Sequence, residues 1–307
     1  MRPFGVLAQP LLFATALMAL AVWNPEIALD TPVYRYLFVL DITQSMNTRD
    51  YRLGGTPTDR LSFAKASIRR ALDDLPCGSA VGLGLFTAQS VELLFEPLEV
   101  CRHRAIVEDV LDHVDWRMAW AADSHIAQGL YAAIRLTRKR GEDLRLVFFS
   151  DGQQTPEISA QPAFTGKPGE VQGFVVGTGG LHPVPIPKLD RDNRALGFWQ
   201  SADLVAPLAS TTYAGLPSLE RTQPEPNAEI YLSWLHEKEL KELSAATGLR
   251  YVRLERPKDL SRALRTPELG EVRRVPTGMG WVFAAGALLS LLWYHRISLT
   301  TSRSENP

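Results

Sequence analysis

Three short segments of the sequence carry oxygen-bearing side chains at spacings that suit a cation. Asp41, Thr43 and Ser45 occupy alternate positions directly after an apolar run. Ser124 precedes a stretch with helical periodicity, and Asp151 follows a second apolar run. Hard cations such as Mg²⁺ prefer oxygen ligands. We therefore predict that the five side chains bind one divalent cation, with Mg²⁺ favoured and Ca²⁺ or Mn²⁺ as alternatives.

Each segment taken singly has a common structural explanation. An aspartate after a strand is often a turn residue, and Ser124 could simply cap its helix. The combination is more specific than its parts, because two of the segments follow the two most apolar of the predicted strands. Ligands of open α/β sheets bind at the carboxyl ends of the strands. The order of the three segments therefore favours a shared site.

The elements that must position these side chains alternate between apolar runs and helical patterns. Continuous apolar runs indicate buried parallel strands, and a short turn between two of them indicates a hairpin. The predicted strands are residues 36–40, 81–86, 91–95, 144–149, 171–176 and 250–254. Apolar residues at helical spacing predict helices at residues 60–75, 106–114, 126–134, 237–247 and 257–264.

This alternation predicts an α/β fold: a Rossmann-like, doubly wound, mostly parallel sheet with one antiparallel edge strand. The domain is expected to cover residues 34–265. It contains a Pro- and Gly-rich insertion at about residues 181–227, where Pro183, Pro185 and Pro187 alternate. A loop of this length inside a domain is usually functional or poorly ordered. Residues 266–274 are interpreted as a juxtamembrane linker.

Two apolar segments frame the predicted domain. Residues 1–24 and 275–294 each contain an apolar run of about 20 residues. A helix of that length is long enough to cross a bilayer. We therefore expect two transmembrane helices, followed by a short tail at residues 295–307. A cleaved signal peptide is the alternative for the first segment, because residues 19–21 resemble a cleavage site. Either arrangement exports the domain and anchors its C-terminal end.

The overall composition excludes few classes of protein. The chain has 307 residues, is 45% hydrophobic and 22% charged, and carries a net charge of -1. This balance gives no reason to expect a nucleic-acid partner. Cys77 and Cys101 flank the predicted hairpin, so they could form a disulfide in an oxidising compartment. Two buried free thiols are the alternative.

The pattern Asp41-x-Thr43-x-Ser45, then Ser124, then Asp151 resembles the metal-ion-dependent adhesion site of von Willebrand factor A (vWA) domains. That family has Asp-x-Ser-x-Ser, a later Thr, and an Asp within a Thr/Ser-Asp-Gly motif. Thr43 and Ser124 depart from it, although both keep a hydroxyl group. The resemblance implies the vWA fold over about residues 34–265 and a coordination position left open for an acidic side chain of a protein partner.

A closer resemblance is to bacterial Bat-type aerotolerance proteins and to the vWA accessory proteins of methanol oxidation. It implies a domain anchored in the bacterial inner membrane and facing the periplasm. It also implies work beside a MoxR-type AAA+ ATPase in the maturation, assembly or metal loading of another protein, methanol dehydrogenase being the best guess. We expect a binding module and no enzyme.

Two other functions remain open at this point. The same carboxylates could serve a metal-dependent hydrolase, although His125 is the only evident general base near them. The chain could instead be a structural membrane protein whose site is degenerate, since two positions of the motif are substituted.

Overall fold

The computed structural model describes residues 4–141, 143–158, 160–201, 203 and 229–303. The chain divides into two units. The larger unit is Val33–Glu271, and the smaller one joins Met1–Pro32 to Val272–Pro307. The candidate site belongs entirely to the larger unit.

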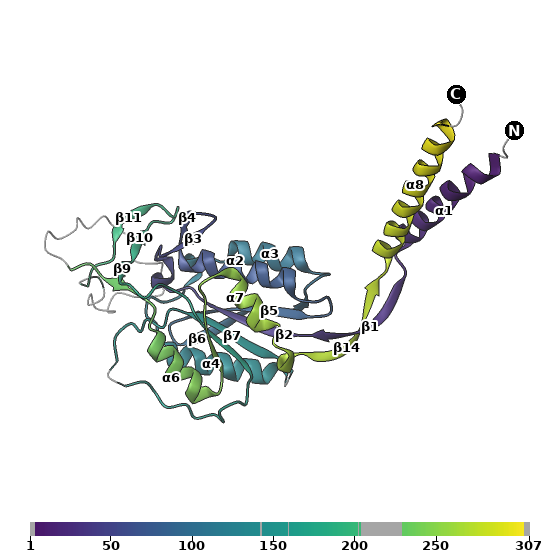
Figure 1. Ribbon diagram of the computed structural model, residues 1–307. Coiled ribbons are helices and arrows are strands. Elements are labelled where there is room, and N and C mark those ends of the chain that lie inside the picture. The colour runs from purple at the N-terminus through teal and green to yellow at the C-terminus, as the bar shows by residue number, and fades with distance from the viewer. Residues whose placement is uncertain (1–3, 142, 159, 202, 204–228, 304–307) are drawn as a thin grey trace. The chain divides into compact units, whose positions relative to one another are not determined.

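A six-stranded sheet forms the centre of the larger unit (Figure 1). Its strands, in spatial order, are β13 (Arg250–Arg253), β8 (Gly173–Gly177), β7 (Arg145–Ser150), β2 (Arg35–Asp41), β5 (Ala80–Thr87) and β6 (Ser90–Glu99). All neighbours pair in parallel except β5 and β6, which pair antiparallel. The predicted mostly parallel sheet with one antiparallel edge strand is confirmed.

Helices cover both faces of this sheet (Figure 1). Helices α2 (Arg60–Asp74), α3 (Arg104–His113) and α7 (Pro257–Leu264) pack on one face. Helices α4 (Ile126–Arg140) and α6 (Glu237–Thr247) pack on the other. A hydrophobic core lies on each face of the sheet. Strand β2 contributes side chains to both cores, because alternate side chains of a strand point to opposite faces. Phe38 belongs to the first core, and its neighbours Leu37 and Val39 belong to the second.

Local sequence signals set where helix α2 begins and where helix α6 ends. Asp59 caps α2 by accepting a hydrogen bond from the backbone N–H of Ser62 at 2.7 Å. Helix α6 ends at Gly248, whose φ of 77° is left-handed, as expected for a glycine after a helix. Gly248 is therefore the C-terminal cap of α6.

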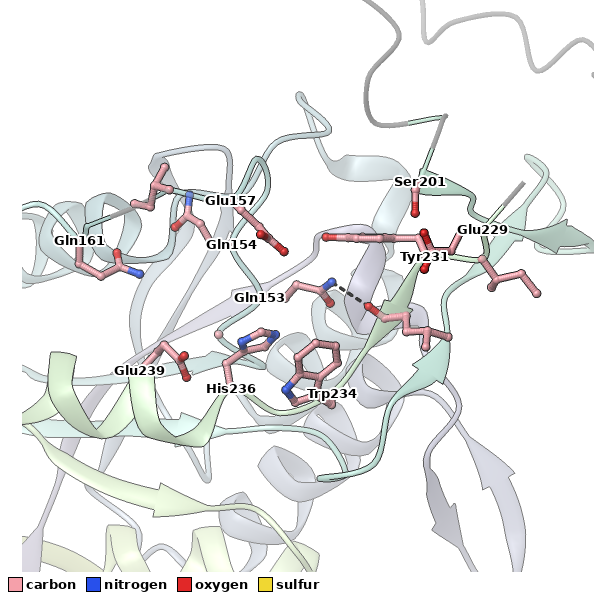
Figure 2. A pocket seen from close by; sticks show the side chains of 14 residues that line it. Gln153, Gln154, Glu157, Gln161, Ser201, Glu229, Tyr231, Trp234, His236 and Glu239 are labelled. Atoms are coloured by element: carbon pink, nitrogen blue, oxygen red, sulfur yellow. Dashed lines mark hydrogen bonds between the residues drawn. The ribbon is translucent and has the colours of Figure 1, made fainter. Parts of the chain in front are cut away.

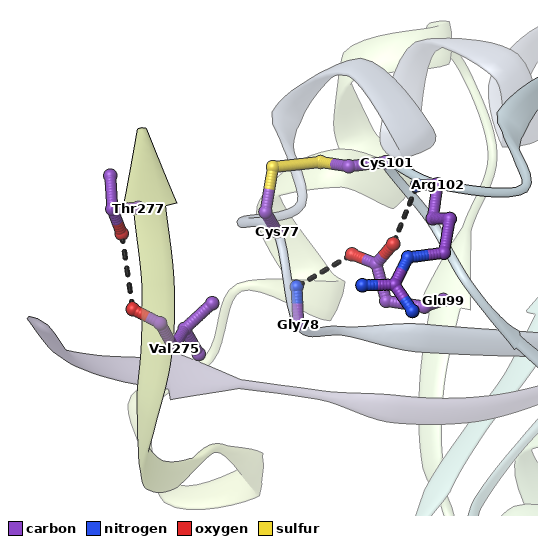
Figure 3. Close-up of a disulfide and its surroundings, with 7 residues drawn as sticks. All are labelled: Cys77, Gly78, Glu99, Cys101, Arg102, Val275 and Thr277. Atoms are coloured by element: carbon purple, nitrogen blue, oxygen red, sulfur yellow. Dashed lines mark hydrogen bonds between the residues drawn. A yellow bond between two sulfur atoms is a disulfide. The ribbon is translucent and has the colours of Figure 1, made fainter. Parts of the chain in front are cut away.

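Cys77 and Cys101 form a disulfide (Figure 3). They precede β5 and follow β6, and their Cα atoms are 5.3 Å apart. Figure 3 also shows the carboxylate of Glu99 beside the bridge, where it accepts hydrogen bonds from the backbone amides of Gly78 and Arg102. The bridge therefore ties the two ends of the β5–β6 hairpin together.

The predicted insertion at residues 181–227 contains short strands in its described part. Strand β10 (Pro187–Leu189) pairs with β11 (Ala195–Phe198), and β9 (Val184–Pro185) pairs with β12 (Leu232–Ser233). Residues 202 and 204–228 lie outside the described residues. Another small hairpin, β3 (Tyr51–Leu53) with β4 (Thr56–Thr58), follows the 3₁₀ helix η1 (Gln44–Asn47).

The smaller unit contains the two predicted membrane segments. They form helices α1 (Phe4–Trp23) and α8 (Gly280–Arg303), and strands β1 (Glu26–Val33) and β14 (Glu271–Gly278) pair with each other. Within the part of the chain that the structure describes, no helix is both long and apolar enough to cross a membrane. The two transmembrane helices expected in residues 1–24 and 275–294 are therefore not confirmed.

The second predicted membrane segment, residues 275–294, does not begin where the helix begins. Residues 275–278 belong to β14, so the helix begins at Gly280 and not at Val275. Residues 271–274 of the predicted linker are part of the same strand. The apolar run therefore combines the end of a paired strand with the first turns of a helix, two elements that an uninterrupted hydrophobic count cannot separate.

Candidate metal centre

The carboxyl ends of β2 and β7 bring two of the three predicted segments into contact. The strands are paired in register up to Leu40 and Phe149, so the next residues, Asp41 and Ser150, are neighbours across the sheet. The hydroxyl of Ser150 donates a hydrogen bond of 2.7 Å to Oδ2 of Asp41. Parallel pairing therefore places the first and last segments of the motif at one edge of the sheet.

The first segment folds back on its own aspartate. Oδ1 of Asp41 accepts hydrogen bonds from the backbone N–H of Thr43 at 3.0 Å and from its hydroxyl at 2.6 Å. The hydroxyl oxygens of Thr43 and Ser45 are 3.4 Å apart. All three side chains are buried. One turn of chain thus gathers a carboxylate and two hydroxyl groups away from bulk water.

Asp151 is held by a tight turn at the end of β7. Its Oδ1 accepts a hydrogen bond from the backbone N–H of Gln153 at 2.9 Å. Gly152 between them has a φ of 78°, and a Cβ atom there would lie 2.9 Å from Cγ of Leu240. Only glycine fits such a position without strain. The glycine of the Ser-Asp-Gly segment therefore fixes where the carboxylate of Asp151 points.

Ser124 reaches the same region through the chain between β5 and α4. Its backbone forms bridges to Ala88, the residue after β5, and to Thr155, which follows the Asp151 turn. The Ser124 N–H donates to the carbonyl of Thr155 at 2.7 Å, and the Thr155 N–H donates to the carbonyl of Ser124 at 2.9 Å. Ser124 is therefore held beyond the ends of β5 and β7.

The hydroxyl of Ser124 has no hydrogen-bond partner, although the side chain is only 3% exposed. It does not cap α4, because that helix begins at Ile126 after His125. Buried hydroxyl groups are nearly always hydrogen-bonded, and an unsatisfied one costs about 1–3 kcal/mol. The structure thus leaves one buried oxygen of the predicted site available to a ligand.

A completely buried arginine completes this cluster. Nη1 of Arg60 lies 2.6 Å from Oδ2 of Asp151 and 2.6 Å from the hydroxyl of Ser233. Its Nη2 lies 2.7 Å from Oδ2 of Asp50. Gly179 lies against the guanidinium group, and a Cβ atom there would be 3.0 Å from Nε of Arg60. Arg60 is thus the positive partner of two buried carboxylates.

The carboxyl group of Asp41 has no such positive partner within the described residues. Burial, followed by the negative charge of Asp151, raises the pKa of Asp41 to about 7. Hydrogen bonds from Thr43 and Ser150 oppose this increase. A buried carboxyl group beside a second one gains most from an additional positive charge. The electrostatics of the cluster therefore favour a cation next to Asp41.

Comparisons with known proteins agree with this geometry. Residues 36–154 match the family model of the von Willebrand factor type A domain. The chain contains a vWA domain. The matched range includes all five predicted ligands. No curated protein matches the chain.

Two solved structures share the fold of this vWA domain. One is an aerotolerance-related membrane protein from Bacteroides fragilis, with a TM-score of 0.52 and 16% identity over 75% of this chain and 96% of that one. The other is the conserved hypothetical protein BatB from Bacteroides thetaiotaomicron, with a TM-score of 0.52 and 18% identity over 76% of this chain and 98% of that one. At such identities the likeness establishes the fold.

Sequence reasoning missed several residues that surround the candidate metal centre. Arg60 and Asp50 form a buried ion pair beside the predicted ligands. The hydroxyl of Ser150 contacts Asp41, and that of Ser233 contacts Asp151. One signal in the sequence could have identified Arg60. A positive charge in the first turn of a helix is unfavourable because it opposes the helix dipole, so an arginine there indicates a negatively charged partner elsewhere. Asp50 lies in a loop and Ser233 in the two-residue strand β12, and no local pattern marks either residue.

Two further features of the vWA domain have structural roles. The Gly177–Gly180 segment supports the ion pair of Arg60 with Asp50. The N–H of Gly179 donates to the hydroxyl of Tyr51, and that of Gly180 donates to the carboxylate of Asp50. His125 lies 3.2 Å from Asp123 and 3.0 Å from the side chain of Gln154. Both nitrogens of the imidazole ring thus have neighbouring polar partners.

Proposed function

We propose that the vWA domain binds a divalent cation, most favourably Mg²⁺, through Asp41, Thr43, Ser45, Ser124 and Asp151, and uses it to capture an acidic side chain of a protein partner. Ca²⁺ and Mn²⁺ are the alternatives. The observation that carries this proposal is the buried, unpartnered hydroxyl of Ser124 at the sheet edge that also holds Asp41 and Asp151.

The residues present fit such an ion chemically. Three hydroxyl groups and two carboxylates are hard oxygen donors, which Mg²⁺, Ca²⁺ and Mn²⁺ prefer. Both substituted positions, Thr43 and Ser124, keep their hydroxyl groups. Burial, followed by the negative charge of Asp151, raises the pKa of Asp41, and a nearby cation would oppose both effects. The degenerate-site alternative therefore has less support than a functional site.

A bound cation with an open coordination position supplies positive charge that attracts a carboxylate. Other residues of the chain orient the two aspartates that would hold the cation. Ser150 and the Thr43 backbone orient the carboxylate of Asp41, and Arg60 orients that of Asp151. The side chains are already gathered before binding, so little conformational entropy is lost when a partner arrives.

We also propose a location and a biological role. The disulfide favours an oxidising compartment, and a fold relative from Bacteroides fragilis is described as a membrane protein. Both support placement at the bacterial inner membrane with the domain facing the periplasm. There the domain would act with a MoxR-type AAA+ ATPase in the maturation, assembly or metal loading of a periplasmic enzyme, with methanol dehydrogenase as the best guess.

Binding is better supported than catalysis. A hydrolase needs a general base that can reach a substrate. The side chain of His125, the base considered from the sequence, is only 25% exposed and lies 3.2 Å from Asp123. The surroundings of His125 thus give the hydrolase alternative no particular support.

Cation-dependent capture tests the proposal. The immobilised chain is incubated with solubilised bacterial membranes and periplasm, in Mg²⁺ or in EDTA. We expect the wild type to retain a protein in Mg²⁺ only, and the Asp41→Ala variant to retain it in neither buffer while keeping its circular dichroism spectrum. Retention of the same protein by the variant and in EDTA would refute the metal mechanism.

A further inference from the structure

A cavity of about 370 Å³ adjoins the candidate metal centre (Figure 2). Its wall begins at Gly152 and Gln153, directly after Asp151 in the chain. The segment between β12 and α6 lies beside these residues and contributes Trp234 and His236 to the lining. A protein that docks at the carboxyl end of β7 would therefore also meet this cavity.

Three carboxylates line the cavity. They belong to Glu157, Glu229 and Glu239, and none of the described residues that line the cavity is a lysine or an arginine. Across the described part of the chain, none of the three carboxylates forms an ion pair. Uncompensated negative charge in a concave site attracts cations. The cavity therefore favours a positively charged ligand.

Flat aromatic surfaces form a second feature of the cavity. The rings of Trp234 and His236 are stacked, with centroids 4.7 Å apart and planes inclined by 21°, and Tyr231 also lines the cavity. Trp234 remains 38% exposed. Planar guanidinium groups stack on such rings, with tryptophan as the best partner. The shape of this wall thus suits an arginine better than a compact ammonium group.

The side chain of Gln153 provides a polar anchor. It is only 5% exposed, and its Nε2 donates to the carbonyl of Leu232 at 3.1 Å, whereas its Oε1 is buried without a hydrogen-bond partner. Figure 2 shows Gln153 between the carboxylate of Glu157 and the rings of Trp234 and His236. The unused Oε1 can accept one N–H of a guanidinium group whose other N–H groups reach a carboxylate.

We propose that this cavity binds an arginine side chain of the protein partner. The inference rests on the proposed function only in assuming that the partner docks at the edge of the sheet that carries Asp151. The partner would then present an acidic residue to the cation and an arginine to the neighbouring cavity. Two opposite charges at a fixed spacing would give the interface its register.

The test uses the full chain labelled with ¹⁵N-tryptophan and the probe N-acetyl-arginine methylamide. The indole signal of Trp234 is assigned with a Trp234→Phe variant. We expect this signal to shift saturably with a millimolar dissociation constant, and the neutral isostere N-acetyl-citrulline methylamide to bind at least tenfold more weakly. Equal binding of the two probes, or no shift with arginine, would overturn the proposal.

Variants locate the bound probe. Replacing Glu157 and Glu239 together by glutamine is expected to weaken arginine binding at least tenfold. Glu242→Gln, which removes a charge from the same helix outside this cavity, is the matched control and is expected to leave affinity unchanged. Equal affinity of the double variant and the control would contradict the assignment.

A final comparison separates this inference from the proposed function. Arginine binding is expected to persist in EDTA and in the Asp41→Ala variant, because the cavity residues do not hold the cation. Loss of Mn²⁺ binding with arginine binding intact would sink the metal proposal alone. Intact Mn²⁺ binding without an arginine-induced shift would sink the cavity proposal alone.

Discussion

Nη1 of Arg60 lies 2.6 Å from Oδ2 of Asp151, and both side chains are completely buried. The pair joins the first turn of α2 to the end of β7, and Asp50 extends it on the other side of the guanidinium group. Such a buried pair is costly to break, because the remaining charge keeps no partner. The same contact holds Asp151 in place at the candidate metal centre.

Arg60→Met is therefore expected to destabilise the domain by about 3–5 kcal/mol, because Asp151 and Asp50 lose their buried positive partner. Urea unfolding at pH 7 followed by circular dichroism measures this change. Arg69→Met provides a control, since Arg69 is partly exposed and pairs with the exposed Asp112. A loss below about 1 kcal/mol for Arg60→Met would show that the buried pair contributes no more than a surface pair.

Ser124→Ala is expected to act differently with and without metal. In EDTA the variant should be as stable as the wild type, or more stable by about 1–3 kcal/mol, because it removes an unsatisfied buried hydroxyl. In Mg²⁺ it should lose most of the thermal stabilisation that the ion gives the wild type. Thermal unfolding in the two buffers provides the comparison.

Ser67→Ala is the matched control for that experiment, because the buried hydroxyl of Ser67 donates to the carbonyl of Phe63 at 2.7 Å within α2. This variant should lose stability equally in both buffers. If Ser124→Ala behaved in the same way, Ser124 would have a purely structural role.

Glu99 links stability to pH near the disulfide. Partial burial opposes ionisation, but backbone N–H groups of Gly78, Arg102 and Cys101 hold the pKa of Glu99 below its usual range. A depressed folded-state pKa adds stability above the unfolded-state pKa of about 4.3, and this stability is lost as pH falls through the folded value.

Glu99→Gln should therefore cost about 0.5–1.5 kcal/mol at pH 7, a modest amount because the carboxyl group is only partly buried and solvent screens it. The difference between wild type and variant should vanish below about pH 3. Urea unfolding from pH 3 to 7 measures the trend, and a difference that grew toward low pH would have the wrong sign.

Loss of the disulfide is expected to cost about 3 kcal/mol, as chain entropy predicts for a bridge between residues 24 apart. The double variant Cys77→Ser, Cys101→Ser tests this value by chemical unfolding under oxidising conditions. Reduction of the wild type should reproduce the same loss. Identical unfolding midpoints for wild type and double variant would show that the bridge does not restrain the unfolded chain.

Strands β2 and β7 of the central sheet were predictable because they are buried on both faces. Residues 36–40 and 146–149 are uninterrupted apolar runs for that reason. The motif aspartates were also predictable, since they directly follow these runs. Their convergence depends on strand order, which the register of β2 with β7 supplies.

Other features depend on contacts between distant parts of the chain. Arg60 is buried only because Asp50, Asp151 and Ser233 surround it, and these residues are spread from position 50 to 233. The pairing of β1 with β14 likewise joins the two ends of the described chain, so neither strand was visible as a local pattern. Local periodicity carries no information about such partners.

Direct titration with Mn²⁺ tests the central claim most sharply. Isothermal calorimetry at pH 8, where Asp41 is ionised, should show one binding site per wild-type chain. Asp41→Asn should abolish that binding, Ser124→Ala should weaken it at least tenfold, and Ser67→Ala should leave it unchanged. Absence of Mn²⁺ binding to the folded wild-type chain, or equal binding by all four proteins, would contradict a cation site built from these residues.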